Sequence, residues 1–137
     1  MKLIPMLCFC CAVLVCGGEY GKELPLKRIP GVDEGAMATA LYRNTLWVAG
    51  SRGTLFAFDV SEPRTPKLIS KLRVMKNCRQ MAVRNGLAAV VGRQNGMVLV
   101  DIRTPGSPRP LSRYQSIELA TGIDLTEKYA YIGNRIY

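Results

Sequence analysis

The sequence predicts an all-β protein built from repeated, four-stranded antiparallel sheets. The first observation is an internal repeat: LFAFDVSEPRTPKLIS at residues 55–70 is followed by the similar VLVDIRTPGSPRPLS at residues 98–112. The second is that short runs rich in valine, isoleucine, threonine and aromatic residues alternate with breaks of glycine, asparagine and proline, as strands alternate with turns. Four short strands recurring about every 40 residues are typical of a β-propeller blade. We therefore predict an incomplete β-propeller of about two and a half blades, preceded by a signal-peptide helix.

Residues 1–18, MKLIPMLCFCCAVLVCGG, have the layout of a secretory signal peptide. Lys2 precedes an apolar run over residues 3–15, and the small residues Gly17 and Gly18 follow it. The run is shorter than the roughly 20 residues that a helix needs to span a bilayer. We expect cleavage near Gly17 or Gly18 and an exported protein, located in the periplasm, at the cell surface or outside the cell. A short anchor that stays on the protein is the alternative.

The cysteines follow the same division. Four of the five lie in the predicted signal peptide, namely Cys8, Cys10, Cys11 and Cys16. The remaining one, Cys78, has no partner for an intrachain disulfide, and we expect it to be a small buried residue rather than a reactive thiol. VLVCGG also resembles the site at which bacterial lipoproteins are cut and lipidated, which would anchor the protein to a membrane through Cys16. Because Val15 stands where that family prefers Gly, Ala or Ser, we expect ordinary cleavage instead.

The chain is basic, with a formal net charge of +9. Such a balance can indicate a nucleic-acid or an acidic partner. Here the basic residues are scattered, no run is longer than Lys27–Arg28, and no aromatic residues interleave with them to form a stacking platform for bases. We therefore expect no nucleic-acid partner, and interpret the charge as solvated, with weak attraction to anionic lipids, polysaccharide or cell wall.

The repeat has a period of about 42 residues, close to the length of one propeller blade, and this step relates Asp59 to Asp101. The same step relates Trp47, Ala89 and Tyr131, so that RNTLWVAG, NGLAAVVG and EKYAYIGN are three copies of one element. We divide the chain into a signal peptide (1–18), a linker that alternatively supplies an outer strand closing on the last blade (19–35), a first repeat (36–77), a second repeat (78–119) and a partial third repeat (120–137).

Each full repeat divides into four expected strands. In the first repeat they cover residues 37–42, 45–50, 54–60 and 66–73. In the second they cover residues 79–83, 87–92, 97–102 and 109–115. No segment shows a sustained helical period. We expect Gly53 and Gly96 to allow a positive φ in the hairpins between the second and third strands.

Residues shared by the two repeats are interpreted as structural turn residues: Asp59, Pro63, Pro66, Asp101, Pro105 and Pro108. Each aspartate ends a third strand, where its carboxylate can accept hydrogen bonds from backbone amides two residues on. The first proline of each repeat fixes φ in the turn and ends the strand. The second proline stands at the start of the outer strand, where a missing N–H is tolerated. Metal binding by the two aspartates is the alternative that we disfavour.

These residues carry a resemblance to a known family. VLVDIRTPGSP resembles the LVIVD repeat, a bacterial propeller-type repeat, in its hydrophobic residues, its Val-Asp pair and the two prolines that follow. FAFDVSEPRTP matches the same pattern, and LWVAG and AYIGN match the strand that precedes it. The first copy departs from the family's name, with Phe56-Ala57-Phe58 before Asp59. The resemblance covers residues 36–137 and implies export to the cell surface or periplasm; it implies no enzymatic activity.

The sequence contains no recognisable chemical site. Histidine is absent, which removes the commonest general base and excludes Ser–His–Asp and Cys–His arrangements. The segments GSRG and GRQNG lie between strands, so they predict hairpin turns rather than phosphate-binding loops. The carboxylates with no partner that the sequence can place are Asp33, Glu34, Glu118 and Asp124. We predict no catalytic residue, cofactor or metal, and interpret Arg52 and Arg93 as exposed turn residues or, alternatively, as lining one face of the ring.

Two function classes follow. The first is a non-catalytic propeller module, exported and presenting its loops to a protein or glycan partner as a scaffold. The second is a fragment of a propeller enzyme, a hydrolase or lyase, whose catalytic residues lie in other blades. Since closed propellers have 4–8 blades, we expect either a piece of a longer propeller or copies that self-associate through open blade edges.

Overall fold

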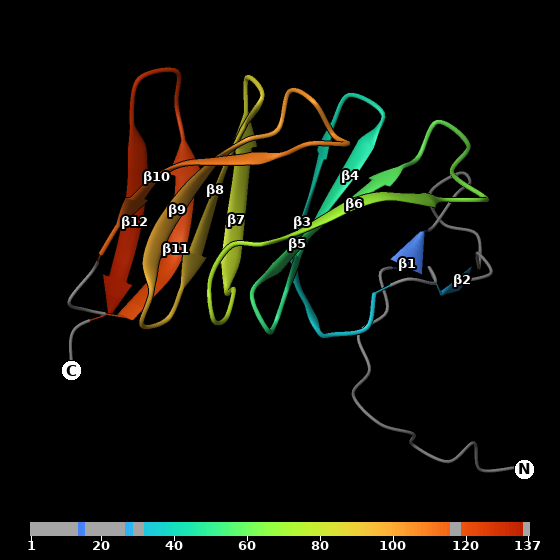
Figure 1. Ribbon diagram of the computed structural model, residues 1–137. Coiled ribbons are helices and arrows are strands. Elements are labelled where there is room, and N and C mark those ends of the chain that lie inside the picture. The colour runs from blue at the N-terminus through green and yellow to red at the C-terminus, as the bar shows by residue number, and fades with distance from the viewer. Residues whose placement is uncertain (1–13, 16–26, 29–31, 116–118, 136–137) are drawn as a thin grey trace, which may run out of the picture.

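The computed structural model describes residues 14–15, 27–28, 32–115 and 119–135. The regular secondary structure of these residues consists of β-strands, without a helix (Figure 1). The first four-stranded sheet contains β3 (Ala36–Tyr42), β4 (Thr45–Gly50), β5 (Thr54–Asp59) and β6 (Lys67–Arg73). The second contains β7 (Gln80–Arg84), β8 (Leu87–Gly92), β9 (Gly96–Asp101) and β10 (Arg109–Tyr114). A third sheet contains β11 (Leu119–Leu125) and β12 (Ala130–Arg135).

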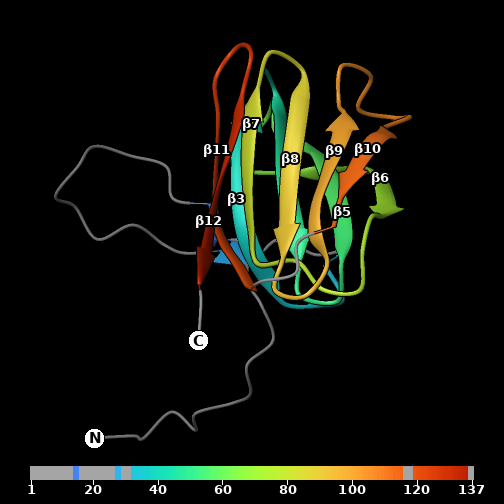
Figure 2. The ribbon, with the colours of Figure 1, turned by 90° about the vertical axis from the view of Figure 1, so that its left-hand side faces the viewer.

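All three sheets are antiparallel, and neighbours in sequence are neighbours in space. β7 contacts both β3 and β11, so the first strands of the three units lie together. Figure 2 shows these strands on one side of the molecule and the outer strands β6 and β10 on the other. The all-β, propeller-like architecture predicted from the repeat is confirmed.

The strand register repeats with the sequence. Asp59 pairs with Thr45, and one period further on Asp101 pairs with Leu87. The inner hairpins match in all three sheets, through the pairs Ala40–Trp47, Ala82–Ala89 and Asp124–Tyr131. The outer strands also share a β-bulge, which leaves Ile69 and Leu111 without a partner in the ladder. The repeated sequence therefore encodes a repeated backbone.

The middle strands bury both of their faces. Between the first and second sheets, Trp47, Leu55 and Ala57 pack with Val90, Val98 and Val100 in one cluster. On the opposite face of the first sheet, Val48, Phe56 and Phe58 pack with Val32. On the opposite face of the second sheet, Ala89 and Val91 pack with Ala120, Ile123 and Leu125 of β11. Burial on both sides explains why TLFAFD and LAAVVG read as nearly continuous apolar runs.

The segment predicted to be a signal-peptide helix lies mostly outside the described residues. Its described part, Leu14–Val15, forms the short strand β1, which pairs antiparallel with β2, Lys27–Arg28. These two residues are therefore in a strand and not in the expected helix, because their backbone pairs with residues 27–28. Within the described ranges, no helix is long and apolar enough to cross a membrane.

The links between units pack onto the hairpin turns of the sheets. Val74 N and Met75 N both donate hydrogen bonds to Gly53 O, at 2.9 and 3.3 Å. Gly53 has a φ of 96° and Gly96 a φ of 63°, which confirms the positive φ expected at both residues. Glycine adopts this left-handed conformation without the steric cost of a Cβ atom.

A second pair of glycines, Gly50 and Gly92, lets the links approach the ends of β4 and β8. A Cβ atom on Gly92 would lie 2.3 Å from Asn77 O and 2.6 Å from Met75 Sδ. A Cβ atom on Gly50 would lie 2.4 Å from Glu34 Cδ. The glycine that ends the repeated VAG and VVG segments is therefore needed because a link between units packs directly against its backbone.

We predict that Gly92→Ala destabilises the fold by roughly 1–3 kcal/mol, because the clash is with a backbone carbonyl that must shift together with its link. Gly106→Ala is the matched control, since the nearest atom to a Cβ there lies 3.9 Å away; its effect should stay within about 0.5 kcal/mol. Urea unfolding of the two variants and the parent measures both. Equal midpoints for the two variants would contradict the close approach.

Candidate functional site

The two ends of the sheets differ in chemistry. The end that lies at the top of Figure 1 is called the upper end. It carries the β3–β4 and β7–β8 turns and the loops at residues 60–66 and 102–108. The lower end carries the β4–β5 turn (51–53), the β8–β9 turn (93–95) and the links at residues 32–35 and 74–79. Each end thus gathers segments that lie far apart in the sequence.

The two aspartates predicted as turn residues lie at the upper end. Asp59 Oδ1 accepts hydrogen bonds from Ser61 N at 2.9 Å and from Ser61 Oγ at 2.6 Å. Asp101 Oδ1 accepts from Arg103 N at 3.0 Å, and its Oδ2 accepts from Arg103 Nη2 at 2.5 Å. Arg109 Nη2 lies 3.7 Å from Asp101 Oδ2. Both carboxylates are therefore engaged within their own loops.

These contacts also lower the pKa values of the two carboxyl groups. At Asp59 the hydrogen bonds from Ser61 hold the pKa below its ordinary value. At Asp101 the hydrogen bonds from Arg103 lower the pKa strongly, and the charges of Arg103 and Arg109 add to the effect. Hydrogen bonds to the charged form and nearby cations both favour a carboxylate over its acid.

The four predicted turn prolines lie in the same loops. Thr65 N donates to Glu62 O, and Ser107 N donates to Thr104 O, both at 3.0 Å. Pro63 and Pro105 thus stand at the second position of a β-turn, where proline's fixed φ fits. Pro66 and Pro108 come directly before the outer strands β6 and β10. Ser70 Oγ donates to Pro105 O at 2.5 Å, which joins the outer strand of one unit to the loop of the next.

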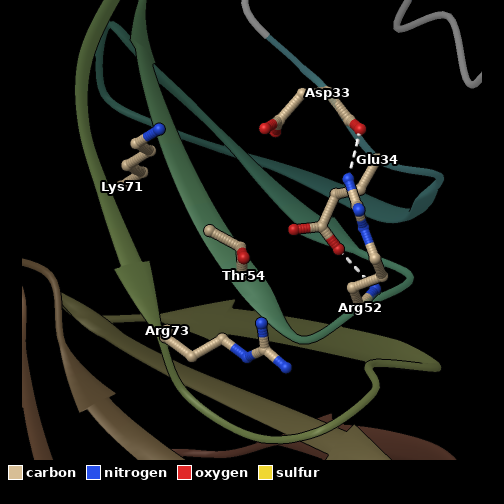
Figure 3. A pocket seen from close by; sticks show the side chains of 6 residues that line it. All are labelled: Asp33, Glu34, Arg52, Thr54, Lys71 and Arg73. Carbon is tan, nitrogen blue, oxygen red and sulfur yellow. Dashed lines mark hydrogen bonds between the residues drawn. The ribbon is translucent and has the colours of Figure 1, made fainter.

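The first pocket of the lower end combines acids and bases. Its volume is about 440 Å³, and it is lined by Asp33, Glu34, Arg52, Thr54, Lys71 and Arg73. Figure 3 shows the two carboxylates on one side and the side chains of Lys71 and Arg73, both from β6, on the other. Opposite charges thus face each other across the pocket.

Glu34 is held in this pocket by its own neighbours. Its Oε2 accepts a hydrogen bond from Arg52 N, while Arg52 Nη2 donates to Asp33 O (Figure 3). Its carboxylate occupies the space left by the missing side chain of Gly50. Glu34 is only 8% exposed, so the β4–β5 turn provides the hydrogen bond that a buried carboxylate requires.

The second pocket lies between the first two sheets. We call it the inter-blade pocket; its volume is about 370 Å³, and it is lined by Met37, Ser51, Asn77, Cys78, Arg79, Arg93 and Gln94. Two pairs of its residues, Met37 with Arg79 and Ser51 with Arg93, are each separated by one period of the repeat. Equivalent positions of adjacent units therefore build this pocket together.

Cys78 lines the inter-blade pocket. It is buried and free, which confirms the expectation of a small buried residue. Burial raises the pKa of its thiol to about 12; the Glu34 carboxylate adds to this rise, and Arg73 partly opposes it. The thiolate is the nucleophilic form of cysteine, and the raised pKa favours the protonated thiol of Cys78 near neutral pH.

The sequence predicted the positions of some residues at the lower end but not of others. Arg52 and Arg93 were expected either as exposed turn residues or as lining one face, and both are exposed and line pockets at the same end. The roles of Glu34, Lys71 and Arg73 were missed. The only feature of the sequence that points to them is the glycine repeated at positions 50 and 92. It indicates that another segment packs closely against the end of the strand, but it does not identify the residue that does so. Among the described residues, no group of three or more metal-binding side chains occurs.

Comparisons with known proteins agree with the repeat and the fold. Residues 77–116 match the family model of the LVIVD repeat. Among solved structures, the chain is similar to two computationally designed propeller proteins, Ika4 (16% identity, TM-score 0.62) and Ika8 (15% identity, TM-score 0.62). The alignments cover 77% and 78% of this chain, but only 64% of the Ika4 chain and 32% of the Ika8 chain. No curated protein matches.

We predict that Asp101 contributes stability that is lost in acid. Because its folded-state pKa is lowered, the contribution is fully present above the unfolded-state pKa of about 3.9 and disappears as the pH falls through the folded-state value. Asp101→Asn should therefore lower Tm at pH 7, and its Tm should converge with the parent's toward pH 2. Asp59→Asn, which removes a carboxylate without an ion pair to arginine, should give a smaller change. A Tm difference for Asp101→Asn that is constant from pH 7 to pH 2 would contradict this account.

Proposed function

We propose that this LVIVD-repeat protein is an exported, non-catalytic propeller module whose lower end binds a protein or glycan partner at the cell surface, in the periplasm or outside the cell. The observation that carries the proposal is the pairing of two pockets at one end of rigid sheets. Turns and links from separate units supply their polar and charged side chains. Binding residues are found disproportionately on such loops, held in place by a rigid scaffold.

The cations that line the two pockets support this choice of face. At the upper end, the Asp101 carboxylate is nine-tenths buried and bonded to Arg103, and Asp59 is bonded to Ser61. At the lower end, Lys71, Arg79 and Arg93 make no side-chain hydrogen bond or ion pair with any described residue. Cationic groups that no described residue engages are available to a ligand.

The proposal that the module is non-catalytic rests on the kinds of side chain that the chain contains. The chain contains no histidine, and the thiol of Cys78 is buried with a raised pKa. The charged groups at the lower end suit recognition through hydrogen bonds and charge. Export rests on the layout of residues 1–18.

Export is tested with a fusion of residues 1–35 to a reporter enzyme that is active only outside the bacterial cytoplasm. We expect reporter activity from the parent fusion. Leu14→Arg, which places a charge in the apolar run, should abolish it, whereas Leu26→Arg, the same substitution outside the run, should leave it unchanged. An inactive parent fusion, or equal activity of the two variants, would contradict export.

A further inference from the structure

We propose that the inter-blade pocket binds the carboxylate of an acidic sugar unit, a hexuronate, within a glycan. The inference rests on the proposed function, because it names the partner class for the same face of the molecule. It is carried by the side chains that line the pocket, by the two arginine side chains that no described residue engages, and by the size of the space.

The charged groups of the pocket are all cationic. Arg79 and Arg93 line it, and no carboxylate does, in contrast to the neighbouring pocket that holds Asp33 and Glu34. Among the described residues, neither guanidinium makes a hydrogen bond or an ion pair. A guanidinium presents a planar fork of N–H donors that matches a carboxylate through two parallel hydrogen bonds. The pocket therefore offers two guanidinium groups for anion recognition that no described residue engages.

The neutral groups of the pocket suit sugar hydroxyls. Ser51 Oγ already accepts a hydrogen bond from Gly35 N at 3.0 Å, which leaves its own proton to donate. Asn77 Oδ1 accepts from Asn95 Nδ2 at 3.3 Å, which leaves the Asn77 amide N–H groups to donate. Gln94 adds both a donor and an acceptor. Met37 and the buried Cys78 supply the apolar part of the lining, against which a sugar ring can pack.

The pocket has a suitable size and a firm wall. Its volume of about 370 Å³ lies within the range of small-ligand pockets, about 300–1,000 Å³. The wall formed by Asn77 rests against Gly92, where no side chain intervenes. The same link is tied to its neighbours through the hydrogen bond from Arg113 Nη2 to Val74 O at 2.8 Å. A fixed wall reduces the entropic cost of binding.

A glycan fits these observations better than a nucleic acid does. The lining contains no aromatic side chain on which a base could stack. A further cation, the exposed Lys76, lies in the link at residues 74–79 at the same end. A polyanionic chain that leaves the pocket on this side would thus meet a further cation, which adds to the attraction toward the site.

The test is a titration of the purified full chain with a trimer of galacturonate, with the neutral trimer of galactose and with inorganic phosphate, followed by calorimetry. We expect binding of the galacturonate trimer that weakens as salt is raised, and no measurable binding of the neutral trimer. Arg93→Gln and Arg79→Gln should each weaken binding by roughly ten-fold or more, because each removes a charge-assisted hydrogen bond. Arg84→Gln is the matched control, since Arg84 is also exposed but ends β7 at the upper end.

Several results would overturn the inference. They are the absence of galacturonate binding, equal loss in Arg84→Gln, or no loss in Arg93→Gln and Arg79→Gln while their Tm values match the parent's. Phosphate binding as tight as that of the trimer would show an oxyanion site that does not recognise a sugar, and competition by a single-stranded nucleic acid at equal affinity would show general polyanion binding. The reporter fusion measures export alone, so failure of the pocket and failure of the proposed location are distinguishable.

Discussion

Burial of both faces of the middle strands is the constraint on which this structure depends. β4, β5, β8 and β9 have apolar side chains on both faces, so both faces of each sheet must be covered to keep these side chains from water. Trp47 faces the second sheet, while the next residue, Val48, faces the other way toward Val32. Burying one such side chain contributes roughly 1.5–3 kcal/mol. Stacking of units, rather than the stability of any single sheet, therefore holds the fold together.

The repeated register follows from the same constraint. Successive side chains of a strand point to opposite faces, so a slip of one residue would move every side chain of the slipped strand to the opposite face of its sheet. The pairs Thr45–Asp59 and Leu87–Asp101 show the register held constant over one period. This is why a sequence spacing was sufficient to predict strands, hairpins and the equivalence of the two aspartates. The β-bulges at Ile69 and Leu111 were not predictable, because no residue type marks an extra residue in an exposed outer strand.

The candidate site was less accessible from the sequence than the fold was. Glu34, Arg52 and Lys71 belong to a link, a turn and an outer strand, and only the folded sheets bring them to one pocket. Periodicity relates Ser51 to Arg93, but it cannot show that both line one space between adjacent sheets. The molecule thus uses its two ends differently. The repeated aspartates at the upper end close loops within a unit, as Asp101 does with Arg103, whereas Arg79 and Arg93 at the lower end line a pocket and make no ion pair with a described residue.

The central claim is that units one period apart share one backbone arrangement, and nuclear magnetic resonance tests it most directly. Cross-strand nuclear Overhauser effects between backbone protons should connect Ala57 with Ser70 and, equivalently, Leu99 with Ser112. The inner hairpin of the third unit should connect Asp124 with Tyr131, as Ala82 connects with Ala89. Contacts displaced by even one residue in one unit relative to another, or helical contacts along β5 or β9, would contradict the account.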